Sequence, residues 1–183
     1  MKKMDMRQMT LVGLMTAVLC ILGPLSITLP FTPIPISFTN LGIYFIIFIL
    51  GWKLSTMSVV VYILLGMVGL PVFSGFSGGA AKVAGPTGGY LIGFIFMAII
   101  AGWFVERFEG KILMYMIGMV VATAVTYAFG TAWLCVQMHL TPIQGLTVGV
   151  LPYIPGDIVK MIVGILVGSK VKKAVRVSAV FES

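Results

Sequence analysis

The sequence predicts an all-α integral membrane protein with six transmembrane helices, cytoplasmic N- and C-termini, and outer loops that cap a ligand pocket. Composition is the first observation behind this prediction: 60% of the 183 residues are hydrophobic, 9% are charged, and the mean hydropathy is +1.13. Soluble domains carry roughly 25% charged residues, so this chain cannot cover a water-facing surface. The second is that basic residues gather at alternate helix ends, as in cytoplasmic segments. At this length we expect a single domain, residues 1–183.

The first predicted span covers residues 9–27. We expect it to be a retained helix, because its apolar run is long for a signal peptide and no A-x-A-like cleavage site follows. Gly13 and Ala17 stand four residues apart on it, a small-xxx-small pattern that lets another helix approach closely. Three prolines then break any helix within residues 29–35, which we expect to form an extended, uncharged outer loop.

The second and third predicted spans cover about residues 37–50 and 55–70. Trp52 and Lys53, which lie between them, are residue types that favour a membrane interface. Residues 71–90 follow and are rich in glycine, yet they are apolar enough to lie at membrane depth. Irregular backbone is tolerated there only where it is buried in protein or lines a cavity.

The fourth predicted span covers about residues 89–104, and the fifth covers about residues 112–136. Residues 141–154 contain glycine and proline, and we expect them to form a loop with some helix. The sixth span begins near Pro155 and ends in a basic cluster at residues 170–176.

The positions of the basic residues test this arrangement. With six spans and a cytoplasmic N-terminus, the inside segments hold Lys2, Lys3, Arg7, Lys53, Arg107, Lys111, Lys170, Lys172, Lys173 and Arg176. Only Lys82 lies in an outer loop, and Lys160 lies in the sixth span. The arrangement therefore satisfies the positive-inside rule. The net charge of +7 forms no stripe with interleaved aromatic residues, so we expect no nucleic-acid partner.

Asp157 and Lys160 are nearly the only opposite charges inside an apolar segment, and their spacing places them on one face of a helix. Because charge at membrane depth is costly, the pair is a functional-site hypothesis; the alternative is a structural pair whose charges neutralise each other. Asp157, close behind Pro155 at a helix start, can accept hydrogen bonds from N–H groups, and Lys160 offers three donors. Together they match a ligand with N–H and C=O side by side, such as a urea or a cyclic amide.

Further candidate contacts lie in the outer loops, which we expect to fold over this pair. Glycines such as Gly79 let the backbone approach a ligand closely, although a tight turn that packs two loops explains them equally well. Tyr90, Tyr127 and Trp133 are candidate aromatic walls, with packing or interface roles as the alternative. The candidate polar contacts are Thr39, Asn40 and Ser77.

Several classes of function are disfavoured. Cys20 and Cys135 lie in apolar runs, and the single His139, which we interpret as an interface residue, has no His/Cys cluster around it, so we expect no metal site. No paired carboxylates, G-x-S-x-G or H-E-x-x-H motif indicates an enzyme. The glycine-rich stretch lacks the G-x-x-x-x-G-K-[ST] phosphate motif, and no ATP-binding motif is present elsewhere, so if the chain takes part in transport, any energy for it must come from a partner.

Four segments together resemble one known family: PIPI at 33–36, GLPVF at 69–73, GPTGGY at 85–90 and IPGDIVK at 154–160. In this order and at these intervals they are similar to the BioY family, the biotin-specific substrate-binding (S) components of energy-coupling factor (ECF) transporters. The resemblance spans nearly the whole chain. It implies high-affinity capture of biotin at the outer face of a prokaryotic plasma membrane and delivery inward by a multi-pass protein, without catalysis and without a cofactor.

The same resemblance implies partners and contact residues. A transmembrane coupling (T) protein would contact Gly13 and Ala17, and two cytoplasmic ECF ATPase subunits would hydrolyse ATP. The ligand contacts that carry over are Asp157, Lys160, Ser77 and Tyr90.

The sequence departs from the family pattern at three positions. Thr39 stands where a glutamine is expected, some relatives have asparagine at the Ser77 position, and some have arginine at the Leu91 position. Without that arginine the valeryl carboxylate of biotin needs another donor, and Lys82 is our hypothesis for it. The open alternatives are an S component for another small vitamin, a membrane-embedded enzyme with Asp157 and Lys160 as acid and base, and a purely structural helical subunit.

Overall fold

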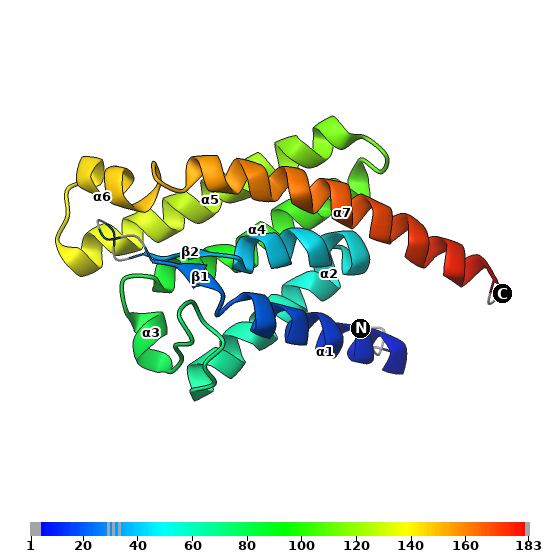
Figure 1. The fold of residues 1–183 in the computed structure, drawn as a ribbon, viewed down its shortest axis with the longest axis horizontal. Helices are drawn as coiled ribbons and strands as arrows, with labels where there is room; N and C mark the ends of the chain where they lie inside the picture. The colour runs from blue at the N-terminus through cyan, green and yellow to red at the C-terminus, as the bar shows by residue number, and fades with distance from the viewer. Residues whose placement is uncertain (1–4, 29, 31, 33, 182–183) are drawn as a thin grey trace.

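The computed structural model describes residues 5–28, 30, 32 and 34–181, with the backbone alone for residues 173 and 175–181 (Figure 1). Lys2 and Lys3, and the side chains of Lys173 and Arg176, lie outside the described part of the chain. The elements are α1 (Met6–Leu22), β1 (Ser26–Ile27), β2 (Ile36–Ser37), α2 (Thr39–Val68), α3 (Ala80–Ala84), α4 (Gly88–Arg107), α5 (Ile112–Met138), α6 (Pro142–Gly149) and α7 (Ile154–Phe181).

Three helices in the described residues, α2, α4 and α5, are long and apolar enough to cross a membrane. A bent pair, α6 with residues 154–172 of α7, passes the same test when its two parts are taken as one span with a 50° bend. Helix α1 is apolar but shorter, with 17 residues. These helices are those of a membrane protein, and the count of six crossings stays a prediction.

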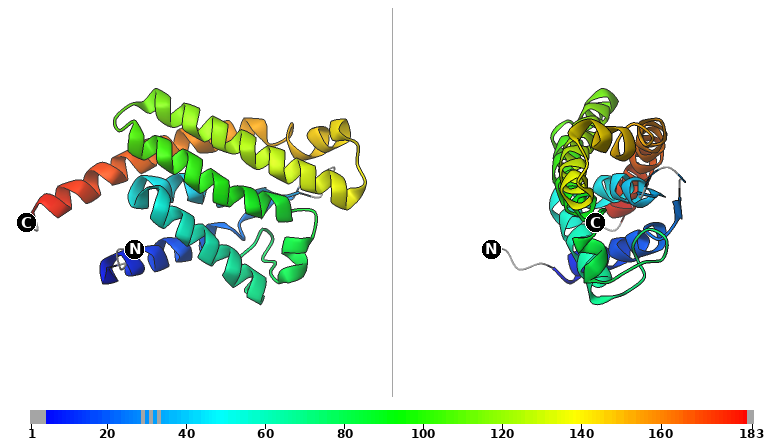
Figure 2. Two further views of the ribbon diagram at one scale, coloured as in Figure 1. Left: turned by 180° about the vertical axis from the view of Figure 1, so that it is seen from behind. Right: turned by 90° about the vertical axis from the view of Figure 1, so that its left-hand side faces the viewer.

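Helix α2 combines the second and third predicted spans. Gly51 has φ 72° and ψ −177°, which is not helical, and the chain reverses its direction there (Figures 1 and 2). Glycine adopts positive φ without the steric cost that other residues incur. The Glu106 carboxylate accepts a hydrogen bond from the Trp52 amide at 2.9 Å and caps the second arm. The predicted break is therefore confirmed, but it is a single residue between a first arm (39–50) and a second arm (52–68).

The all-α prediction missed a small antiparallel sheet. Strands β1 and β2 pair with Ser26 opposite Ser37 and Ile27 opposite Ile36, and they bring together the ends of the proline-containing loop. Two-residue strands are too short to produce a readable period-2 pattern, so the sequence could not predict them. The glycine-rich stretch likewise contains the short helix α3, which was not expected.

The boundaries of the later helices differ modestly from the predictions. Helix α4 continues to Arg107 and α5 to Met138, while α7 passes through the basic cluster and ends at Phe181. The expected partial helix between α5 and α7 is α6. Thr141 caps it, because its hydroxyl accepts from the Gln144 amide at 3.4 Å while the Gln144 side chain accepts from the Thr141 amide at 3.0 Å.

The core lies between α2, α4, α5 and α7, where large side chains such as Tyr44, Phe48 and Met119 are fully buried. Helix α1 packs on the second arm of α2, with the Thr16 hydroxyl donating to the Ser58 carbonyl at 3.3 Å. Both termini lie at one end of the bundle, and the β1–β2 sheet, α3 and α6 lie at the other (Figures 1 and 2). We call the latter the loop end.

Candidate functional site

A cavity of about 60 Å³ lies at the loop end, and its wall is built from nearly every part of the fold. It is lined by β2, the start of α2, the loop before α3, and residues of α3, α4, α5, α6 and α7. Two of its lining residues are charged and almost completely buried, namely Asp157 at 3% exposure and Lys160 at 7%.

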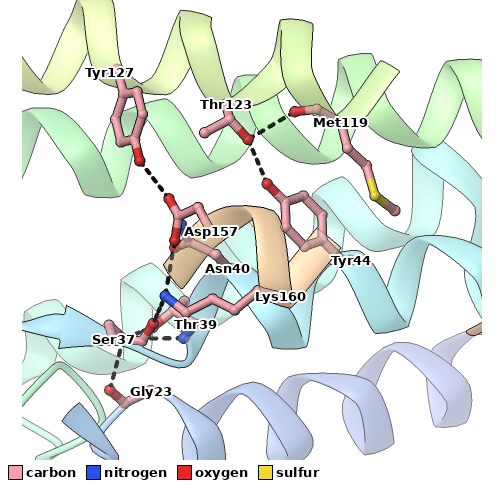
Figure 3. Close-up of polar contacts among 10 residues, drawn as sticks. All are labelled: Gly23, Ser37, Thr39, Asn40, Tyr44, Met119, Thr123, Tyr127, Asp157 and Lys160. Atoms are coloured by element: carbon pink, nitrogen blue, oxygen red, sulfur yellow. Dashed lines mark hydrogen bonds and ion pairs between the residues drawn. The ribbon is translucent and has the colours of Figure 1, made fainter. Parts of the chain in front are cut away.

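Asp157 and Lys160 form the predicted pair on the first turns of α7. The Lys160 ammonium donates to Asp157 Oδ1 at 2.9 Å (Figure 3). The chain enters α7 through Tyr153, whose carbonyl accepts from the Asp157 amide at 2.8 Å. Asp157 therefore lies in the first helical turn, where the helix dipole favours a negative charge.

Three other elements bring polar groups to this pair, as Figure 3 shows. Asp157 Oδ2 accepts from the Tyr127 hydroxyl of α5 at 2.7 Å and from Asn40 Nδ2 of α2 at 3.2 Å. Lys160 Nζ also donates to the carbonyl of Ser37, in β2, at 2.7 Å. The sheet thus contributes directly to the site, because it fixes the position of that carbonyl.

The hydrogen-bonding capacity of the pair is only partly used by these contacts. A carboxylate offers about four lone-pair positions and an ammonium offers three protons. Asp157 accepts from Lys160, Tyr127 and Asn40, and Lys160 donates to Asp157 and Ser37. These hydrogen bonds leave about one acceptor position on Asp157 and one donor on Lys160, whose ammonium also lies 6.0 Å from the centre of the Phe38 ring. A neighbouring acceptor and donor match a planar group that carries N–H beside C=O.

A neighbouring network fixes α2 against α5 close to this pair. The Tyr44 hydroxyl and the Thr123 hydroxyl share a hydrogen bond of 2.5 Å, and Thr123 donates to the Met119 carbonyl at 2.7 Å (Figure 3). Both side chains are buried. The arm that carries Asn40 and the helix that carries Tyr127 are therefore held in a defined relation to each other.

A match to a known protein family covers this architecture almost from end to end. The family model described as "BioY family" matches residues 1–177. The chain belongs to the BioY family. A relative from Thermotoga maritima, named biotin transporter BioY, is 35% identical over 168 residues, which is 92% of this chain and 97% of that protein. A relative of the same name from Rhizobium etli is 34% identical over 177 residues, with 92% and 94% covered.

A solved structure supports the same assignment at the level of the fold. The crystal structure of the S-component for biotin from an ECF-type ABC transporter superposes with a TM-score of 0.85 and 32% sequence identity. The match covers 91% of this chain and 91% of that one. The helical arrangement described above is therefore that of an S component.

The structure brings three of the predicted loop contacts to the cavity wall. Asn40, Lys82 and Tyr90 all line it together with the ion pair. The Tyr90 hydroxyl is engaged elsewhere, since it donates to the Gly149 carbonyl at 2.9 Å and lies 3.2 Å from the Thr131 hydroxyl. Tyr90 therefore offers its ring to the cavity, as an aromatic wall would.

Three other predicted contacts are not among the residues that line the cavity. The Thr39 hydroxyl bonds the Ser37 hydroxyl at 2.6 Å, and the Ser77 hydroxyl donates back to the Ser74 carbonyl at 2.8 Å. Gly79 has φ 95° and precedes α3, so its conformation serves the loop. Ser74 lines the cavity where Ser77 was expected.

Several residues of the site were not identified as polar contacts from the sequence. Tyr127 was expected only as an aromatic wall, but its hydroxyl bonds Asp157. Tyr153 lines the cavity, and its hydroxyl contacts the Ile34 carbonyl and lies 2.9 Å from the Thr32 hydroxyl. Its position beside the IPGD segment was the one available signal. Trp133 is not a wall residue, because it donates to the Gly85 carbonyl at 2.9 Å and is absent from the lining.

The small residues of α1 lie on its exposed face. Gly13 and Ala17 are both exposed, and a Cβ added at Gly13 would meet no atom within 4 Å. Nothing in the described fold therefore requires their small size. Among the described residues there is also no group of three or more His, Cys, Asp or Glu side chains that could hold a metal ion.

Proposed function

We propose that the chain is the biotin-binding S component of an ATP-driven ECF transporter. It captures biotin at the outer face of the membrane and delivers it inward, and it catalyses no reaction itself. The family membership, the names of the relatives and the description of the solved S-component support this assignment. Biotin is the ligand, and the proposal requires no cofactor.

The observation that carries the proposal is the partly satisfied pair of Asp157 and Lys160. The ureido ring of biotin presents N–H beside C=O. An N–H of this ring would donate to the remaining acceptor position of Asp157, and its carbonyl oxygen would accept from the remaining Lys160 proton. Charge-assisted hydrogen bonds of this kind are about twice as strong as neutral ones. Asn40 and Tyr127 hold the Asp157 carboxylate in position for this contact. The ring of Tyr90 would pack against the bound ligand.

The valeryl carboxylate requires a cation elsewhere in the cavity. Lys82, on α3, is the basic residue besides Lys160 among the described lining residues. We assign the carboxylate to Lys82. The ureido ring of biotin would then contact α7, and its carboxylate would contact α3. Thr39, Ser77 and Gly79 remain predicted contacts that would require a rearrangement of the start of α2 and of the loop before α3.

Topology follows from the distribution of charge. We propose that residues 1–183 form one domain with six crossings of a prokaryotic plasma membrane, in which each arm of α2 counts once. Both termini lie on the cytoplasmic side, since Lys53, Arg107 and Lys111 belong to the same end of the bundle. The loop end then opens outward, where biotin is captured.

The remaining subunits of the transporter follow from the same proposal. A transmembrane coupling (T) protein contacts the exposed Gly13 and Ala17 of α1, because small residues let a second helix approach closely. Two cytoplasmic ECF ATPase subunits supply the energy.

A calorimetric titration of the detergent-purified chain with biotin tests the proposal. Desthiobiotin, riboflavin and thiamine serve as comparators. We expect biotin to bind far more tightly than riboflavin or thiamine, and to raise the melting temperature as its occupancy rises. Tighter binding of another vitamin would make the chain an S component of different specificity. Absence of stabilisation by any of them would indicate a structural subunit, and product formation would indicate an enzyme.

A further inference from the structure

A second hollowed surface lies on the outside of the bundle, between the second arm of α2 and α4. Two adjoining hollows of about 340 Å³ and 260 Å³ run between residues 52–61 and residues 99–103, and they share Trp52 and Ile99. We call this surface the α2–α4 groove. Met57, Val60 and Trp103 in its walls are between 36% and 46% exposed, so the groove presents apolar side chains outward.

The residue types in the groove change along its length. Trp52, Lys53 and Trp103 belong to the end near the α2 reversal, and Val60 and Val61 belong to the other end. The Lys53 ammonium lies 5.4 Å from the centre of the Trp52 ring. Tryptophan and lysine favour the headgroup level of a bilayer, whereas aliphatic side chains favour the hydrocarbon. The groove therefore has the polarity profile of a lipid molecule.

Its length agrees with this interpretation. Residues 52–61 of α2 advance by about 14 Å at 1.5 Å per residue. The hydrocarbon core of a bilayer is about 30 Å thick, so one leaflet spans about 15 Å. A groove that starts at an interfacial tryptophan and continues for this distance has the length of one leaflet.

Lys53 is the charged residue among the described residues that line the headgroup end of the groove. Within the described part of the chain no carboxylate forms an ion pair with Lys53, which is exposed. Glu106 belongs to the same end, where its carboxylate accepts a hydrogen bond from the Trp52 amide, but it lines neither hollow. We propose that the α2–α4 groove binds one anionic phospholipid, with an acyl chain between the two helices and the phosphate at Lys53.

Tryptophan quenching by brominated lipids tests the proposal. Trp133 lies at the loop end, so the Trp133→Phe chain reports only Trp52 and Trp103. Two bilayers are compared that contain the same fraction of brominated lipid, which is phosphatidylglycerol in one and phosphatidylcholine in the other. We expect the groove to be occupied by the anionic lipid about five times as often as by the zwitterionic one, which is the effect of one lysine near the headgroups. Lys53→Gln should remove the preference. Lys111→Gln is the matched control, since Lys111 belongs to the same end but lines neither hollow.

Equal quenching by the two lipids in the Trp133→Phe chain would overturn the proposal. An equal loss of the lipid preference when Lys53→Gln or Lys111→Gln is added to that chain would also overturn it. Native mass spectrometry covers the case in which Trp133→Phe does not fold. It needs no fluorescence reporter, so all three tryptophans of the chain can stay in place. There the expected result is a phosphatidylglycerol adduct that Lys53→Gln loses and Lys111→Gln retains. Retention of the adduct in Lys53→Gln would contradict the assignment.

Discussion

Replacement of Asp157 by asparagine changes the site by a single atom and removes its negative charge. In the structure the carboxylate faces three protein donors, on Lys160, Tyr127 and Asn40, at 2.9, 2.7 and 3.2 Å. A ureido N–H of biotin would be the fourth. An asparagine side chain has one oxygen with two lone pairs, and its NH₂ group is itself a donor. At most two of the four donors could then be satisfied, and the buried Lys160 would lose its counter-charge.

The expected size of the effect follows from this count. A hydrogen bond to a charged group contributes about 1.5–3 kcal/mol net, which corresponds to a loss of biotin affinity of roughly 10- to 150-fold. The unliganded protein should also lose stability, since removing one partner of a buried ion pair costs about 3–5 kcal/mol. Calorimetric titration with biotin measures the first effect. A melting curve without ligand measures the second and shows whether the variant is folded.

A matched control is available at the other end of the bundle. Lys172 forms an ion pair with Glu109 at 3.1 Å, and their side chains are 19% and 45% exposed. Lys172→Met also breaks an ion pair, but far from the cavity, and an exposed pair contributes only about 0–1 kcal/mol. We expect its biotin affinity to equal that of the parent chain. If folded Asp157→Asn had a biotin affinity within about twofold of that of the parent chain, the proposed hydrogen bond between Asp157 and the ureido ring would be refuted.

Three further predictions concern other parts of the proposal. Tyr127→Phe removes only the hydroxyl that donates to Asp157, so it should weaken biotin binding by about tenfold in the same titration; unchanged affinity would show that Asp157 needs no such support. Lys82→Ala should lower the affinity for biotin about fivefold, the effect of about 1 kcal/mol, but should not change the affinity for biotinamide, which lacks the carboxylate. Equal losses of affinity for both ligands would exclude Lys82 as the partner of the valeryl carboxylate. Gly13→Leu should abolish co-purification of the coupling protein while biotin binding persists, and undiminished co-purification would move the interface elsewhere.

The parts of the site that the sequence could predict are local in the chain. Asp157 and Lys160 are three residues apart after a proline, so helical periodicity alone places them on one face. Gly51 could be predicted as a break because it lies between two apolar runs. The positions of such features depend on neighbours a few residues away, and those neighbours are visible in a single sequence.

The rest of the site depends on contacts between distant segments. Asn40 and Tyr127 lie 117 and 30 residues from Asp157 in the chain, and the Ser37 carbonyl lies 123 residues from Lys160. No periodicity links them. The place of Ser77 depends on a turn as well: residues 73 and 77 pair across it, and the Ser77 hydroxyl donates to the Ser74 carbonyl. Turn geometry of this kind is not visible in a single sequence, so Ser77 as a ligand contact stays a prediction.

The structural and the ligand-binding interpretations of the ion pair do not exclude each other. Burial of two charges costs more than their attraction returns unless their remaining lone pairs and protons are also bonded. Ser37, Asn40 and Tyr127 meet most of this requirement, so the pair is tolerated without a ligand. We propose that the remaining positions, about one acceptor on Asp157 and one donor on Lys160, set the ligand selectivity. A ligand with N–H beside C=O satisfies both, whereas a ligand with acceptors alone leaves a lone pair of Asp157 unmatched and desolvated. If the proposed site is correct, a preference for a cyclic urea would follow from the same hydrogen bonds that make the buried pair stable.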